Sequence, residues 1–281
     1  MNKSLTARSL ILALALVLVA ASFPIHAQQQ EKYQPTVGQQ GKDVVWVPTN
    51  EGLVNKMLDL AQVTSDDYVI DLGSGDGRTV IAAAKRGARA FGIEYNPDMV
   101  ELSKQNAAEA GVSDKATFVK ADLFESDFSK ATVITMFLLP DINLKLRPKL
   151  LDLKPGTRIV SNSFTMEEWQ SDGTATMEAG CTTWCTAYLW IIPAKVEGKW
   201  QLPNGELTFN QKFQMVTGTL SLDGKDTPIS GKLIGEQISF DAGDSEYSGQ
   251  MNGDAISGIV KSSAAESKWS AIREVTAVGS R

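Results

Sequence analysis

Short apolar runs alternate with helical hydrophobic patterns between residues 47 and 192. The runs have the length and the Val, Ile and aromatic content of buried strands, whereas apolar residues three and four positions apart indicate one face of a helix. Strands are predicted at residues 68–72, 89–93, 116–119, 131–138 and 158–163. Helices are predicted after Pro48-Thr49, which we expect to cap the first one, around Val80, from Asn96-Pro97 to Gly111, and at residues 143–153.

Strands that alternate with helices form βαβ units, in which neighbouring strands run parallel. We therefore predict an α/β fold over residues 46–194, a Rossmann-like sandwich with a mainly parallel sheet. Residues 174–178 and 184–192 are expected to form an antiparallel hairpin that closes this sheet.

The pattern changes after Pro193, where short apolar runs are separated by Gly, Ser and Thr. Asp223-Gly224 and Asn252-Gly253 are hairpin-turn signals, and no helix of useful length fits. Strands are predicted at residues 207–215, 219–222, 231–234, 237–240, 247–251, 255–260 and 268–273. Residues 195–281 are therefore predicted to form a small antiparallel β-rich domain, either a barrel or a curled meander.

The first 27 residues have the pattern of a secretory signal peptide. Lys3 and Arg8 precede an apolar run at residues 10–21, and Ile25-His26-Ala27 is a plausible cleavage site. The run is shorter than the roughly 20 residues of a membrane span. We expect cleavage before Gln28, giving a periplasmic or secreted protein without a stable membrane span; the alternative is an uncleaved N-terminal anchor. Residues 28–45 are predicted to be a flexible lead-in.

Charge and histidine content exclude several classes of function. The chain has a formal charge of −6, and removing residues 1–27 takes away Lys3 and Arg8 but no acid, leaving 25 basic against 33 acidic residues. Nucleic-acid binding needs a basic surface, so no nucleic-acid partner is expected. The single histidine is His26, so the processed chain would have no histidine for a catalytic triad, a general base or a metal site.

The two cysteines, Cys181 and Cys185, are too few for a structural zinc site, and no metal is predicted. Within one strand they would stand about 13 Å apart at ~3.3 Å per residue, too far to bond each other. We therefore expect two unpaired thiols.

The segment Asp71–Arg78 lies between a predicted strand and a predicted helix. Gly73, Gly75 and Gly77 would let the backbone turn tightly around Ser74 and approach a ligand closely. The free N–H groups at the start of the following helix would point to the same place.

Two further acids follow the next predicted strands: Glu94 ends the second, and Asp122 comes just after the third. Because the carboxyl ends of parallel strands share one edge of the sheet, we expect Asp71, Glu94 and Asp122 to lie together beside the glycine turn. An acid at the position of Glu94 is suited to bind ribose hydroxyls.

The turn favours a cationic nucleoside over a nucleotide. Arg78 stands where a dinucleotide fingerprint would have its last glycine, and no Gly-x-x-x-x-Gly-Lys motif is present. The negative charge of Asp71 would repel a pyrophosphate. S-adenosylmethionine (SAM) carries a sulfonium and an ammonium, and it is the cofactor that these residues predict.

The sequence resembles the class I SAM-dependent methyltransferases over residues 46–193, and more closely the FAM173-like protein-lysine methyltransferases. The resemblance lies in Val47-Pro48-Thr49, Asp71–Arg78, Gly92–Pro97, Phe137–Pro140 and Gly156–Phe164. It implies that residues 71–77 are the first cofactor motif, that Glu94 binds the ribose and that Asp122 contacts the adenine. It also implies that Thr49 lies over the cofactor and that Phe137, Leu138 and Pro140 line the methyl-transfer mouth. The β-rich tail and the export signal depart from the family's eukaryotic members.

The favoured hypothesis is N-methylation of a protein lysine side chain by in-line displacement. One alternative is a small-molecule methyltransferase, in which residues 28–47 would supply a lid; another is an exported SAM- or nucleoside-binding module without turnover. Phe137–Pro140 offer apolar walls that would favour an unprotonated amine. Asn162, Ser163 and Trp169 are candidates to border the substrate, and no residue is assigned as a general base.

Overall fold

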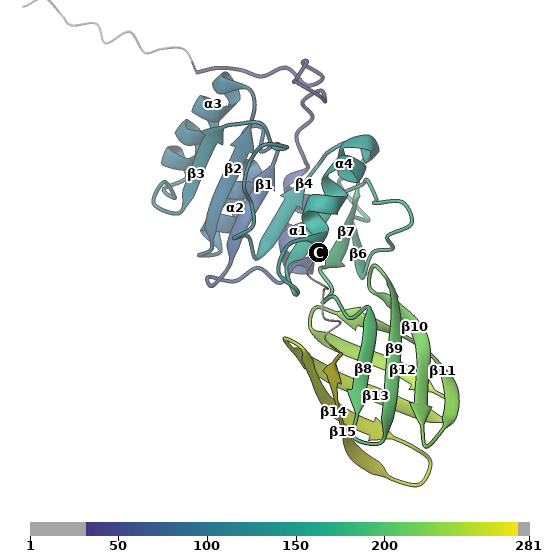
Figure 1. The fold of residues 1–281 in the computed structure, drawn as a ribbon. Coiled ribbons are helices and arrows are strands. Elements are labelled where there is room, and N and C mark those ends of the chain that lie inside the picture. The colour runs from purple at the N-terminus through teal and green to yellow at the C-terminus, as the bar shows by residue number, and fades with distance from the viewer. Residues whose placement is uncertain (1–31, 275–281) are drawn as a thin grey trace, which may run out of the picture. The chain divides into compact units, whose positions relative to one another are not determined.

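The computed structural model describes residues 32–274 (Figure 1). The predicted signal peptide, residues 1–27, lies outside these residues. Two folded parts follow one another along the chain: an open sheet with helices on both faces, and a closed β-barrel. No helix within residues 32–274 is both long enough and apolar enough to cross a membrane.

The first part is built on a seven-stranded sheet with the order β3-β2-β1-β4-β5-β7-β6. Its strands are β1 (Tyr68–Leu72), β2 (Arg89–Glu94), β3 (Ala116–Lys120), β4 (Val133–Met136), β5 (Arg158–Asn162), β6 (Gly173–Thr176) and β7 (Thr186–Ile191). Strands β1 to β5 pair in parallel, while β7 runs antiparallel to both β5 and β6. The predicted mainly parallel α/β sheet with a closing hairpin is confirmed. The chain order reverses between β1 and β4, so ligands are expected at the carboxyl ends of these strands.

Four helices cover the sheet: α1 (Glu51–Leu60), α2 (Arg78–Lys85), α3 (Pro97–Glu109) and α4 (Pro140–Leu151). Helices α1, α2 and α3 pack on one face and α4 on the other, as Figure 1 shows. Strand β1 serves both layers, because Val69 packs with α1 and α2 while Ile70 packs with α4. A strand buried on both faces has a mostly apolar sequence, which is why β1 was predicted with its observed bounds despite Asp71.

Helix starts follow their capping residues, and two predictions need correction. Asn96 caps α3 as expected, accepting a hydrogen bond from the Asp98 backbone N–H at 2.9 Å. Helix α1 is capped by Asn50 rather than by Thr49, because the Asn50 side chain accepts from the Gly52 N–H at 2.8 Å. Helix α4 begins at Pro140, three residues before the predicted start at residue 143, since proline is pre-set for the first helical position.

The second part is an eight-stranded closed barrel, which confirms the predicted antiparallel β-rich domain. Its strands are β8 (Gly198–Leu202), β9 (Gly205–Lys212), β10 (Met215–Leu222), β11 (Lys225–Ile234), β12 (Gln237–Ala242), β13 (Ser245–Asn252), β14 (Ala255–Lys261) and β15 (Glu266–Arg273). The prediction missed β8, and it joined β9 to the start of β10 across Phe213, whose positive φ of 55° places a turn there. Trp200, Phe209, Phe240 and Trp269 pack together inside the barrel, so its interior is filled by side chains.

The expectation of two unpaired thiols is wrong. Cys181 and Cys185 form a disulfide, with their Cα atoms 5.8 Å apart. The predicted distance assumed an extended strand from residue 184, but β7 begins only at Thr186. Trp184 has a positive φ of 55°, so the chain turns back between the two cysteines and brings their sulfur atoms together.

Candidate functional site

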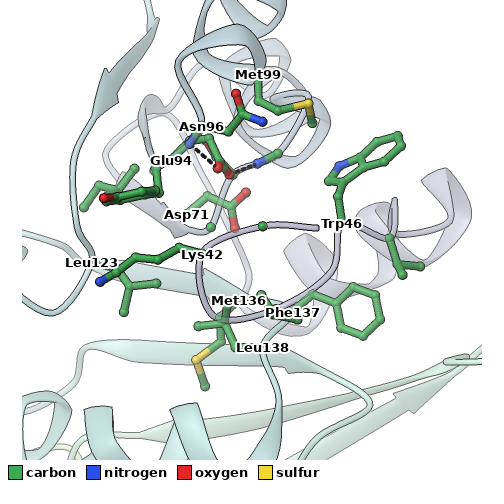
Figure 2. Close-up of a pocket in the computed structure, with 18 of the residues that line it drawn as sticks. Lys42, Trp46, Asp71, Glu94, Asn96, Met99, Leu123, Met136, Phe137 and Leu138 are labelled. Atoms are coloured by element: carbon green, nitrogen blue, oxygen red, sulfur yellow. Dashed lines mark hydrogen bonds between the residues drawn. The ribbon is translucent and has the colours of Figure 1, made fainter. Parts of the chain in front are cut away.

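A pocket lies at the carboxyl ends of the central strands, where the sequence placed its candidate residues (Figure 2). Asp71 is near the end of β1, Glu94 ends β2, and Asp122 follows β3 by two residues. The three acids line one pocket together with the turn after β1 and the segment after β4. Figure 2 shows Asp71 between Glu94 on one side and Met136–Leu138 on the other. The cofactor-site residues that line this pocket are Thr49, Asp71, Gly73, Ser74, Gly75, Glu94 and Asp122.

The glycines of the turn have different tasks. Gly73 and Gly75 have positive φ values of 77° and 54°, which L side chains rarely adopt. A Cβ at Gly75 would lie 2.7 Å from Nε1 of Trp46, so a side chain there would push into the pocket lining. Gly77 does not line the pocket: it is the residue just before α2, and a Cβ there would lie 2.8 Å from the Phe118 ring. Gly77 therefore serves the packing of α2 against the sheet.

Asp71 is a buried carboxylate at the bottom of the site. Its side chain accepts a hydrogen bond from Thr135 Oγ1 at 2.6 Å, and in the described part of the chain it forms no ion pair. The pKa of Asp71 is raised to about 7, chiefly by burial and also by the negative charges of Glu94 and Asp76, while the hydrogen bond from Thr135 opposes the rise. A cationic ligand would supply the positive charge that no side chain places next to this carboxylate in the described residues.

Ser74 is the second feature of the pocket that fits a polar ligand. Its Oγ is buried and has no hydrogen-bond partner within the described residues. Ser74 lines the same pocket as Asp71, and buried hydroxyl groups are ordinarily hydrogen-bonded. An unpaired hydroxyl and an unneutralised carboxylate in one pocket fit a ligand that is both polar and positively charged, as SAM is.

Glu94 is held in a fixed orientation by the backbone. Its Oε2 accepts from the Gly75 N–H and its Oε1 from the Asn96 N–H, both at 2.9 Å (dashed in Figure 2). The carboxylate thus ties the glycine turn to the start of α3. Each oxygen keeps a further lone pair, which suits the acceptance of ribose hydroxyl protons.

Asp122 is paired with a residue that sequence reasoning missed. Its carboxylate forms an ion pair with Lys42 and accepts from the Phe124 N–H at 2.9 Å. The hydrogen bond from Lys42 holds the pKa of Asp122 below its usual range. The Lys42 ammonium also lies 5.2 Å from the centroid of the Tyr95 ring. An adenine amine that reached Asp122 would share this carboxylate with Lys42 or replace Lys42 as its partner.

Lys42 belongs to residues 38–46, which we call the strap. The Gly38 N–H donates to the Trp46 carbonyl and the Trp46 N–H donates to the Gln39 carbonyl, both at 2.9 Å. Most of the strap lines the pocket, and Figure 2 shows its backbone curving across the front of it. The lead-in predicted as flexible at residues 28–45 is therefore partly ordered at the site. The polar composition of this segment hid its contacts, which join residues far apart in the chain.

The predicted mouth and substrate residues lie in different places. Phe137 and Leu138 line the pocket, whereas Pro140 is exposed at the start of α4 and does not. Asn162 is buried next to the pocket residue Thr49, and its Nδ2 donates to Thr49 Oγ1 at 3.3 Å. Trp169 is fully buried in the core, with its ring 6.1 Å from that of Trp190, so its proposed contact with substrate is wrong. A tryptophan after a strand end could not be told from a core residue by its position alone.

Comparison with known proteins identifies the family. The ANTKMT methyltransferase domain matches residues 71–173. A protein-lysine N-methyltransferase from Saccharolobus islandicus is 44% identical over 152 residues, which cover 53% of this chain and 94% of that protein. The adenine nucleotide translocase lysine N-methyltransferase of Mus musculus is 38% identical over 104 residues, 36% of this chain and 45% of its own length. This chain thus spans less than half of the mouse relative.

A solved structure agrees with the fold and the cofactor. An RNA methyltransferase from Salinibacter ruber, crystallised with S-adenosyl-L-homocysteine, is 49% identical and superimposes with a TM-score of 0.50. The match covers 53% of this chain and 96% of that one. The resemblance seen in the sequence and the assignment of SAM as cofactor are confirmed. The buried acid, the glycine turn and these relatives together show that the chain belongs to the SAM-dependent methyltransferases of the ANTKMT-domain family.

Proposed function

We propose that this protein transfers the methyl group of SAM to the side-chain amine of a lysine in another protein. The observation that carries the proposal is the buried, unneutralised Asp71 beside the glycine turn, in a chain 44% identical to a protein-lysine N-methyltransferase. The geometry of the pocket supports the binding of SAM, and the names of the relatives support a lysine side chain as the methyl acceptor.

When bound, SAM supplies a methyl group on a positively charged sulfur. Asp71 would neutralise cationic charge, Glu94 would accept from ribose hydroxyls, and Asp122 would face the adenine amine. The aliphatic side chain of Leu138 in the cofactor pocket would disfavour an ammonium and so lower the pKa of the incoming lysine.

The transfer itself needs alignment more than acid–base chemistry. The lysine ammonium first loses a proton to water. Its nitrogen lone pair then forms the N–C bond while the S–C bond breaks and leaves its electron pair on sulfur. We assign no side chain as general base.

The acidity of the chain supports a protein acceptor over RNA. The Salinibacter ruber relative is named an RNA methyltransferase. RNA binding relies on basic residues that displace counterions, and this chain has 27 basic against 33 acidic residues.

The test is transfer of label, from SAM tritiated in its methyl group, to an extract of the cells that make the protein. We expect label in acid-precipitated protein, in methyllysine after hydrolysis, and none with Asp71→Ala. Label in the RNA fraction would contradict the proposal. Acid-soluble label would support the small-molecule alternative, which the strap across the pocket makes reasonable. SAM binding without any transfer would indicate a binding module.

We further propose that the protein is exported, with residues 1–27 as its signal peptide and a periplasmic or secreted mature chain. The disulfide between Cys181 and Cys185 supports this, because disulfides persist in oxidising compartments. N-terminal sequencing of protein taken from cells should find Gln28 as the first residue. Finding Met1 would overturn the cleavage.

A further inference from the structure

The loop between β6 and β7, residues 177–185, is held more firmly than an exposed loop requires. We call it the disulfide loop, after the bond between Cys181 and Cys185. The Met177 N–H donates to the Cys185 carbonyl at 2.9 Å, and Asn50 Nδ2 donates to the Gly180 carbonyl at 3.1 Å. The loop is thus closed at its base and anchored to the start of α1.

Trp184 is the residue that this loop presents. It is 45% exposed, and its φ of 55° lies in the left-handed region, which is strained for a residue other than glycine. Its ring meets the Phe137 ring edge-on at 5.8 Å, and Phe137 stacks on Phe164 at 5.9 Å. A strained backbone that holds a large apolar ring half out of the core calls for a role other than packing.

Trp184 lines a second pocket that adjoins the cofactor pocket. Both are lined by Val47, Pro48, Thr49 and Phe137, so one opens beside the other. The rest of its lining comes from Val37, Asn50, Asn162, Trp184 and the disulfide loop, and among the described residues it includes no charged side chain. A pocket without basic residues does not suit a phosphate, which argues against a nucleic acid or a nucleotide as its occupant.

The lining suits the side chain of a lysine. Aromatic faces attract ammonium and methylammonium groups, and the attraction remains when methyl groups replace N–H protons. Thr49 and Asn162, which carry side-chain oxygens, belong to the same lining; Asn162 Oδ1 already accepts from Ser163 Oγ at 2.8 Å and keeps a second lone pair. Phe137 lies in both linings, so an aliphatic chain that passes it leads from this pocket toward the cofactor.

We propose that this second pocket is the acceptor site, which takes one lysine side chain against the rings of Trp184 and Phe137, and that the Cys181–Cys185 disulfide keeps Trp184 in place. The inference rests on the proposed protein-lysine activity and adds where the acceptor binds. It assigns Trp184 a role in acceptor affinity, not in cofactor binding.

The first test measures binding without turnover, with the full chain saturated by S-adenosyl-L-homocysteine. The probe is Nα-acetyl-Nε-trimethyl-lysine amide, observed by saturation-transfer NMR. The wild type should give a signal, Trp184→Ala should lose most of it, and Trp184→Phe should keep it. Met215→Ala, which removes an apolar side chain of similar exposure from the barrel, is the matched control and should match the wild type. Equal signals from wild type and Trp184→Ala would overturn the proposal.

The second test measures the acceptor KM and its dependence on the disulfide. The acceptor is the protein fraction that takes up the methyl label in the transfer test. Trp184→Ala should raise the acceptor KM about tenfold, the loss expected from one cation–π contact, while the Kd for SAM stays within twofold. Reduction of the disulfide, or Cys181→Ser with Cys185→Ser, should raise the KM of the wild type but not that of Trp184→Ala. An unchanged KM, or an equal loss of SAM affinity, would contradict the assignment. A wild type that binds the lysine probe but labels no protein would instead count against the proposed function alone.

Discussion

Asp71→Asn should make the cofactor-free protein more stable at pH 8 and abolish its binding of SAM. Burial raises the pKa of this carboxyl from 3.8 to about 7. A carboxyl group whose pKa is higher in the folded than in the unfolded state lowers stability at every pH above its unfolded-state pKa, because the unfolded chain ionises more readily there. The penalty is therefore absent below pH 4, grows between pH 4 and pH 7, and is complete above pH 7.

The size of the penalty follows from the rise in pKa. A rise from 3.8 to about 7, at about 1.36 kcal/mol per pH unit, corresponds to about 4 kcal/mol above pH 7. The asparagine carries no charge, and its Oδ1 can still accept the hydrogen bond from Thr135 Oγ1. We therefore expect Asp71→Asn to be about 2–4 kcal/mol more stable than the wild type at pH 8 and nearly equal to it at pH 4.

Urea unfolding at pH 4 and pH 8, without and with SAM, measures both effects. At pH 8 SAM should stabilise the wild type and leave Asp71→Asn unchanged, because only the charged carboxylate attracts the cationic ligand. Asp98→Asn, an exposed acid in the first turn of α3, is the control and should shift stability by less than about 1 kcal/mol at either pH. A variant that gains no stability at pH 8, or that binds SAM as the wild type does, would refute the account of Asp71.

Three further predictions concern the same site. The affinity of the wild type for SAM should fall by up to about tenfold per pH unit below pH 7, because protonation of Asp71 removes the negative charge that attracts the ligand. Calorimetry that finds a Kd for SAM independent of pH between pH 5.5 and pH 8 would contradict this. Gly75→Ala should lower both stability and SAM affinity, because it adds backbone strain and a close contact with Trp46. Gly111 has a similar positive φ but open space around it, so Gly111→Ala should cost only about 1–2 kcal/mol for the strain. Equal losses of stability for the two variants in urea unfolding would show that the contact with Trp46 does not matter. Lys42→Ala should speed hydrogen exchange at the Trp46 amide by up to about fivefold, as expected for loss of a weak, partly exposed ion pair, and an unchanged rate would mean that Lys42 does not hold the strap.

Several features of this protein were readable from the sequence because they depend on neighbours in the chain. Strand β1 was found from a short, mostly apolar run, and α3 from Asn96-Pro97. Asp71 and Glu94 each stand at the end of a strand, and in a parallel sheet these ends share one edge. Local periodicity together with one topological rule was therefore enough to place the acids beside the glycine turn.

Other features were decided only by contacts between distant segments. The disulfide depends on a backward turn at Trp184, and the strap depends on Lys42 meeting Asp122. The burial of Trp169 likewise depends on Trp190. Patterns of apolar and polar residues record which face of an element is buried, but a loop has no such period. Its conformation is set by whatever packs against it, so the carboxylates of the cofactor pocket were visible in the sequence, whereas the strap and the aromatic pocket emerged only from the folded chain.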